Sequence, residues 1–173
     1  MFAEPIQSPA REYVNRLLYV NVVTALESFL SDFFTYHIKQ DHNLLRKFVE
    51  TTPAFKEQKI PVSDVFRAID AIEKRAESYL SSIVWHRLKI VAALYKNVLD
   101  IEFPDTRELR ETVIELRHEL VHRNGKKKDG NIYVIAEPDI RNAIRLAQML
   151  VDHIEKRWAE ISTPTMPDDS QLF

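Results

Sequence analysis

The sequence contains no cysteine among its 173 residues, and it has only two glycines. Without cysteine, the chain cannot form disulfides, bind zinc through thiolates or use a cysteine nucleophile. Glycine is the usual residue of the tight turns that sheet-rich folds need in number. Its scarcity therefore favours long helices and few hairpins, and a hydrophobic share of 45% is enough for one packed core.

A strong charge of either sign is also missing, because the formal net charge is -2. Any attraction to nucleic acid must therefore come from a local patch. No basic segment followed by an apolar run opens the chain, so we expect no signal peptide. The most apolar stretch, residues 17–30, is interrupted by Asn21, Glu27 and Ser28, and we expect it to be too short and too polar to cross a bilayer. These features predict a cytoplasmic protein without a membrane partner.

Apolar residues at spacings of three and four predict a first helix over residues 10–39. Its buried face is expected to consist of Leu18, Val22, Leu26, Phe29, Phe33 and Tyr36. A short helix over 43–50 and a loop over 51–61 follow. Ser63 is the expected N-cap of a second long helix, which Ser81 and Ser82 interrupt before helical spacing resumes over 83–99.

The second half of the chain begins with a D-x-x-E capping pattern, Asp105 to Glu108, which predicts a helix that runs to Val121 or His122. Two glycine turns then predict a small β-hairpin. Pro138 fits the first position of a final helix that ends at Pro164. The sequence thus predicts an all-α single domain over 1–173, an antiparallel helical bundle of four to five long helices, with flexible tails at 1–9 and 163–173.

The residues best suited to chemistry gather in the segment Arg117-His118-Glu119-Leu120-Val121-His122-Arg123-Asn124-Gly125. On an ideal helix, Arg117 points into the buried face between Val113 and Ile114. A buried arginine is costly unless it is paired or serves a site. Arg117 is therefore a functional candidate, or else it bridges helices by pairing with Glu27.

His122 lies five residues after Arg117, about 140° around an ideal helix. The two side chains can converge if the helix ends at His122, which Asn124-Gly125 favours. They can also converge across a two-fold interface, with each protomer lending one side. Taken alone, His118 and His122 are ordinary surface histidines at a helix end.

A basic cluster follows the histidines and suits phosphate contacts, although, taken alone, it is better explained as a solvated loop in a lysine-rich protein. Its members are Arg123, Lys126, Lys127 and Lys128.

The pattern of Arg117, the polar His118 and then His122 resembles the R-x4-6-H motif of HEPN domains. Residues 25–32, 84–86 and 94–95 are similar to the same bacterial branch of that family, so the resemblance covers most of the chain. It implies a helical bundle, a homodimer whose two motifs face one cleft, and a metal-independent ribonuclease with no cofactor. Such a protein would act on RNA as a toxin, in defence or in RNA processing, and an antitoxin or another regulator protein would be a partner that controls it.

The chemistry that the resemblance implies is physically reasonable. Cleavage of RNA through its own 2′-hydroxyl needs a base for that hydroxyl and an acid for the leaving 5′-oxygen, and histidine can act as either. Two copies of His122 would fill these roles, while Arg117 would stabilise the charge developing on the phosphate. His118 and Asn124 would orient the phosphate or His122. The strand would be held by Arg123, Lys126, Lys127 and Lys128.

Two other functions remain open from the sequence. Residues 118–122 spell H-E-x-x-H, the zinc-peptidase motif, but the extended form of that motif would need a ligand at Lys128. The candidates further along the chain, Asp129, Glu137 and His153, have no recognised spacing. A HEPN-like domain can also be an inactive module that binds RNA or protein, because a fold does not by itself grant an activity.

Overall fold

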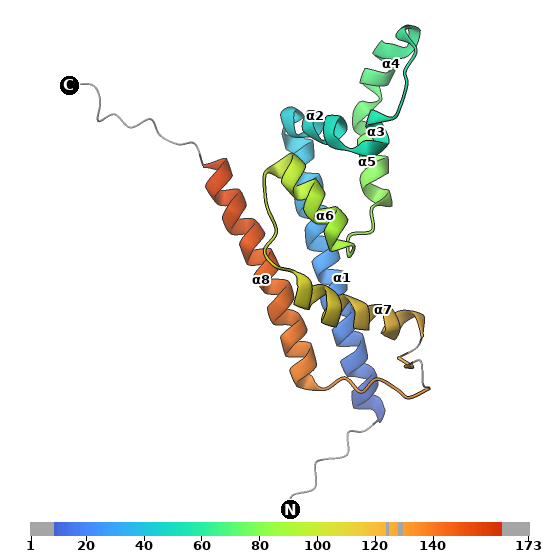
Figure 1. Ribbon diagram of the computed structural model, residues 1–173, viewed down its shortest axis with the longest axis vertical. Coiled ribbons are helices and arrows are strands. Elements are labelled where there is room, and N and C mark those ends of the chain that lie inside the picture. Colours follow the sequence, from blue (N-terminus) through green and yellow to red (C-terminus); the bar gives the residue numbers. More distant parts are fainter. Residues whose placement is uncertain (1–8, 124, 128–129, 164–173) are drawn as a thin grey trace, which may run out of the picture.

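The computed structural model describes residues 9–123, 125–127 and 130–163 (Figure 1). Of the two predicted tails, residues 1–8 and 164–173 lie outside the described residues. Pro9 begins the first helix, and Thr163 directly follows the last one.

Helices make up most of the described residues and no strand is found among them, which confirms the predicted all-α class. In chain order they are α1 (Pro9–Gln40), α2 (His42–Thr51), α3 (Pro53–Lys56), the 3-10 turn η1 (Val62–Asp64), α4 (Val65–Asp70), α5 (Ile72–Ser82), α6 (Leu88–Leu94) and its π-helical continuation η2 (Tyr95–Leu99), the π-helical η3 (Leu109–Ile114), α7 (Glu115–His122) and α8 (Glu137–Ser162).

The helices differ in length and direction from the predicted bundle. Among the described elements, α1 with 32 residues and α8 with 26 residues are long, and α5 has only 11. Figure 1 shows α1 and α8 side by side and running in the same direction, with α7 lying across α1. The second predicted long helix is divided because Ala71 separates α4 from α5, and the expected helical spacing over 83–87 forms a loop instead.

The start of the helix that carries the motif follows half of the predicted capping pattern. The carboxylate of Asp105 accepts a hydrogen bond from the backbone N–H of Arg107 at 2.9 Å. Glu108, the expected second half, instead pairs with Arg145 of α8 at 3.4 Å. The side chain that was expected to cap the helix therefore ties it to α8.

The segment after α7 forms a turn rather than a β-hairpin with two strands. Lys126 and Ile132 form one isolated antiparallel bridge, and the N–H of Tyr133 donates to the carbonyl of Gly125 at 2.8 Å. Gly125 and Gly130 both have positive φ, 73° and 86°. Two such turns only five residues apart leave little room for a longer ladder.

The buried face of α1 is rotated from the predicted one. Leu26 is buried as expected, but Leu18 is 49% exposed and Tyr36 is 60% exposed. The residues of α1 that form the core are Tyr19, Val23, Leu26, Leu30, Phe34 and Ile38. Because α1 is apolar on several sides, spacings of three and four fit two neighbouring faces equally well.

The length and apolar composition of α1 would also allow it to cross a membrane. Residues 10–40 contain an 18-residue window with a hydropathy of 1.3, of which 28% is buried inside the protein. The expectation that this segment is too short and too polar to cross a bilayer was drawn from residues 17–30 alone, and the apolar part of the helix is longer than that run. A core helix of a soluble protein has the same composition, so the cytoplasmic location stays a prediction.

The rotated face leads to a direct test of the core. Phe34→Ala should lower the free energy of unfolding by about 3–5 kcal/mol, because Phe34 is fully buried among aromatic rings. Tyr36→Ala, two residues away on the exposed side, should change it by less than about 0.5 kcal/mol. Urea denaturation of both variants measures the difference, and equal losses would contradict the observed face.

Candidate functional site

The helix that carries the motif, η3 followed by α7, is held against α1 by a hydrogen bond near its start. The Tyr19 hydroxyl donates to the carbonyl oxygen of Thr112 at 3.2 Å. Burial, together with the nearby Asp139 carboxylate, raises the pKa of Tyr19 to about 12, so the hydroxyl keeps its proton and remains a donor. This contact fixes where α7 crosses α1.

Arg117 points toward α1, as its helical position predicted. Its side chain is 17% exposed, and its Nη2 lies 3.6 Å from Oε2 of Glu27. The Nε atom is buried and has no hydrogen-bond partner among the described residues. The guanidinium is therefore paired with a carboxylate but keeps donor capacity that this pair does not use.

Glu27 receives a second side chain, His86, from the loop before α6. The other carboxylate oxygen, Oε1, lies at short hydrogen-bond distance from Nδ1 of His86, and both side chains are largely shielded from water. Three separate segments, α1, the loop 83–87 and α7, thus meet at one carboxylate. The sequence suggested Glu27 as the partner of Arg117 but contained no spacing that pointed to His86.

His118 and His122 lie next to each other on the exposed side of α7. Their ring centroids are 4.4 Å apart, and both residues are exposed. The helix ends at His122, as predicted, and Arg123 caps it. Among the described residues, however, no hydrogen bond or ion pair joins Arg117 to either histidine, so the helix end at His122 does not by itself bring Arg117 and His122 together within one chain.

The predicted strand-binding residues follow the end of α7. Arg123 pairs with Glu119 at 3.3 Å, one turn back on the helix. Lys126 and Lys127 are exposed, and Nζ of Lys127 lies 5.2 Å from the ring centre of Tyr133. Asn124 and Lys128, both predicted site residues, lie outside the described residues.

A second partly buried arginine, Arg16 of α1, supports the turn after the motif. Its side chain is 16% exposed, pairs with Glu12 at 3.6 Å and lies over the ring of Tyr13. A Cβ added at Gly125 would lie 3.3 Å from Nη1 of Arg16. Sequence reasoning missed this residue, although Arg16 and Glu27, eleven positions apart, share one face of α1.

The zinc-peptidase pattern supplies two neighbouring imidazoles but no completed ligand set in the described part of the chain. No group of three or more His, Cys, Asp or Glu side chains there could hold a metal ion. Glu119 is paired with Arg123. His153 contacts the Glu102 carbonyl oxygen at 2.8 Å, Glu137 pairs with Arg141, and Asp129 lies outside the described residues.

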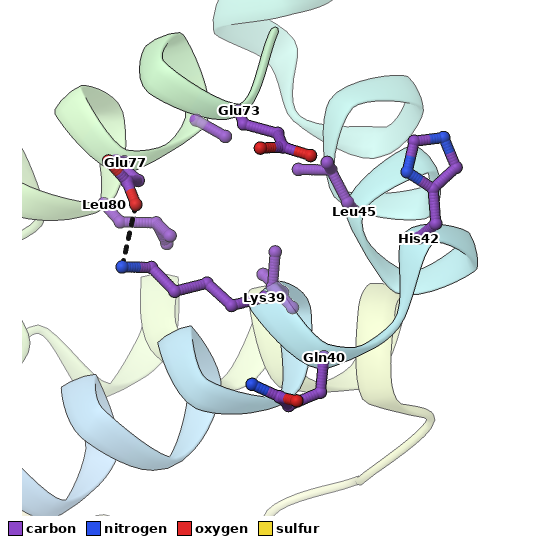
Figure 2. A pocket seen from close by; sticks show the side chains of 9 residues that line it. Lys39, Gln40, His42, Leu45, Glu73, Glu77 and Leu80 are labelled. Atoms are coloured by element: carbon purple, nitrogen blue, oxygen red, sulfur yellow. Dashed lines mark ion pairs between the residues drawn. The ribbon is translucent and has the colours of Figure 1, made fainter.

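Two hollows flank different parts of the fold. The first, about 410 Å³, lies between the end of α1, α2 and α5, where Figure 2 shows the Lys39–Glu77 ion pair, 2.7 Å long, beside Glu73 and Leu45. It contains no residue of the motif. The second, about 580 Å³, is an open groove that includes both His86 and His118, and it therefore adjoins the candidate site.

No family model, curated protein or solved structure matches this chain.

The contact between Gly125 and Arg16 gives a prediction for the turn. Gly125→Ala should destabilise the fold by about 1 kcal/mol or more, because it forces alanine to a φ of 73° and crowds Arg16. Gly130→Ala is the matched control, since it has the same backbone strain but nothing within 4 Å of the new Cβ. Denaturation midpoints should show the larger loss at Gly125, and Arg16→Ala should remove the difference. Equal losses would mean that Arg16 does not support the turn.

Proposed function

We propose that this chain is a HEPN-like domain that cleaves RNA without a metal ion. The cleavage would use the 2′-hydroxyl of the strand as the nucleophile. The observation that carries this proposal is the partly shielded guanidinium of Arg117, which is paired with Glu27, keeps a buried Nε donor without a partner among the described residues, and lies on the same helix as two exposed histidines, one and five residues further along. Phosphoryl transfer needs a positioned cation of this kind next to groups that exchange protons near neutral pH.

In the proposed reaction, His122 removes the proton from the 2′-hydroxyl, whose oxygen attacks the adjacent phosphorus. The bond to the 5′-oxygen breaks, and that oxygen takes a proton from the partner's His122. The products are a 2′,3′-cyclic phosphate end and a 5′-hydroxyl end. Arg117 stabilises the charge on the phosphate oxygens during this step, and His118, whose ring contacts His122, orients that imidazole.

A homodimer completes this site, because one chain does not bring Arg117 and His122 into contact. The exposed face at the start of α1 is suited to a second copy. It has four uncharged, exposed side chains: Tyr13, Val14, Leu17 and Leu18. Tyr13 lies against Arg16, which contacts the turn after His122, so a two-fold axis on this face would bring the two motifs near each other.

The finer features of the fold belong to the same proposal. We infer that α1, α6–η2, α7 and α8 correspond to the helical bundle of HEPN domains, and that the bridged turn after α7 corresponds to the small hairpin. The biological setting of such a nuclease would be a toxin, a defence protein or an RNA-processing enzyme under the control of a regulator protein.

One alternative has an observation in its favour. Arg117 pairs with Glu27, so the arginine can be explained as a structural bridge between α1 and α7 in a module that binds RNA without cutting it. The same cationic surfaces would then hold the strand, and His118 and His122 would have no role in catalysis.

The nuclease proposal predicts chelator-resistant cleavage. In excess EDTA, the native protein should cut single-stranded RNA and leave 2′,3′-cyclic phosphate ends, while His122→Ala should be slower by roughly 10²-fold or more. Product ends can be mapped by phosphatase and kinase treatment followed by gel analysis.

The matched control is His42→Ala, which removes an exposed histidine on α2, outside the motif. It should cleave like the native protein. Binding without cleavage by the native protein would favour the RNA-binding module, and cleavage that requires added zinc would favour the metal-dependent alternative.

The dimer proposal predicts a change of mass. The native protein should have twice the chain mass of 20.3 kDa in light scattering after size exclusion. Leu17→Glu should give the monomer, because the interface would bury an unpaired charge. Phe66→Glu, on the exposed side of α4, should leave the dimer intact. If Phe66→Glu dissociates the dimer and Leu17→Glu does not, the interface lies elsewhere.

A further inference from the structure

The groove beside the motif has walls from two segments that are far apart in the sequence. One wall consists of the end of the loop 83–87 and the first turn of α6, including Arg87, Lys89 and Ile90. The other wall is η3–α7, including Arg110 and His118. Its volume is about 580 Å³. His86 and His118, which lie on opposite walls, connect the groove to the cluster around Glu27 and to the histidine pair of α7.

The groove contains three cationic side chains, and two of them form no ion pair with any described residue. The side chains of Arg87 and Lys89 are exposed and form no hydrogen bond or ion pair with any described residue. Arg110 pairs with Glu111, its neighbour in sequence, and Glu115 is the one carboxylate among the residues that line the groove. In a chain whose net charge is -2, three cations on one groove form a local positive surface.

The groove and the turn after α7 lie on either side of the histidines. Along the helix the order is Arg110 and His118 in the groove, then His122, and then the turn with Lys126 and Lys127. Twelve residues separate Arg110 from His122, which at a rise of 1.5 Å per residue is about 18 Å. An extended strand of that length presents several phosphates.

We propose that single-stranded RNA lies lengthwise along α7, with its phosphates on Arg87, Lys89 and Arg110 on one side of the histidines and on Lys126 and Lys127 on the other. This inference rests on the proposed function, because it takes the histidines as the point of cleavage. The sequence pointed only to the cations after α7. Arg87 and Lys89 lie beside the site because the loop that contains His86 leads directly into α6, where Lys89 lies in the first turn.

The cations of the groove contact phosphates and not bases, so they hold a strand without reading its sequence. The half-exposed side chain of Ile90 adds apolar surface on which a base can rest. Affinity should therefore depend strongly on salt and weakly on sequence.

The test is binding of a labelled 2′-O-methyl RNA strand of about 12 nucleotides, measured by fluorescence anisotropy at salt concentrations from about 50 to about 200 mM. This strand has no free 2′-hydroxyl and cannot be cut by the proposed chemistry. The groove variant is Arg87→Gln with Lys89→Gln. The control is Lys74→Gln with Lys156→Gln, which removes the same charge from exposed positions on α5 and α8 outside the groove.

The groove variant should bind roughly tenfold or more weakly than the control at the lowest salt, and its salt slope should fall by about 1.4, which corresponds to two phosphate contacts on a single strand. Equal affinity of the two variants, or no binding by the native protein, would overturn the inference. Because the probe cannot be cleaved, weakened binding by the groove variant together with no cleavage of ordinary RNA would support the groove and reject the nuclease.

Discussion

The carboxylate of Glu27 receives Arg117 from α7 on one oxygen and His86 from the loop before α6 on the other. A carboxylate shielded to this degree is costly without partners, and removing one member of such a group leaves the other charge uncompensated, at a cost of about 3–5 kcal/mol when the pair is fully buried. Part of that cost is offset here because Glu27 and Arg117 keep some contact with water. Together with the Tyr19–Thr112 hydrogen bond, this cluster fixes both the position and the rotation of α7 on α1.

The rotation of α7 decides which residues can take part in chemistry. Because Arg117 points toward α1, His118 lies on the exposed side of α7. The ring of His122, one turn later, packs against the ring of His118. The same rotation places Arg110 and His118 on one wall of the open groove, while the loop that supplies His86 also supplies Arg87 to the other wall, and the first turn of α6 supplies Lys89. The cation that would meet a phosphate, the histidines that would move protons and the groove that would hold the strand thus depend on one partly buried carboxylate.

Features set by local sequence were predicted well, and features set by distant contacts were not. The end of α7 at His122 and the inward direction of Arg117 follow from the Asn-Gly turn signal and from helical geometry, and Glu27 was named as a possible partner. His86 and Arg16 reach the site only through tertiary packing, which no spacing encodes. The buried face of α1 was predicted wrongly at Leu18 and Tyr36 because the helix has more than one apolar side, and packing against α2, α7 and α8 selects among them.

In the proposed function, Arg117 binds a phosphate and does not only hold α7 on α1. Replacing a shielded ion pair with less polar side chains of similar size is often neutral or stabilising, so stability and activity can be separated. We would measure the free energy of unfolding and the RNA-cleavage rate of the double variant Arg117→Met with Glu27→Gln, in which glutamine can still bond His86. We expect a free energy of unfolding within about 1 kcal/mol of that of the native protein, together with loss of RNA cleavage. A variant that folds and still cleaves RNA at the native rate would show that Arg117 is only a structural bridge.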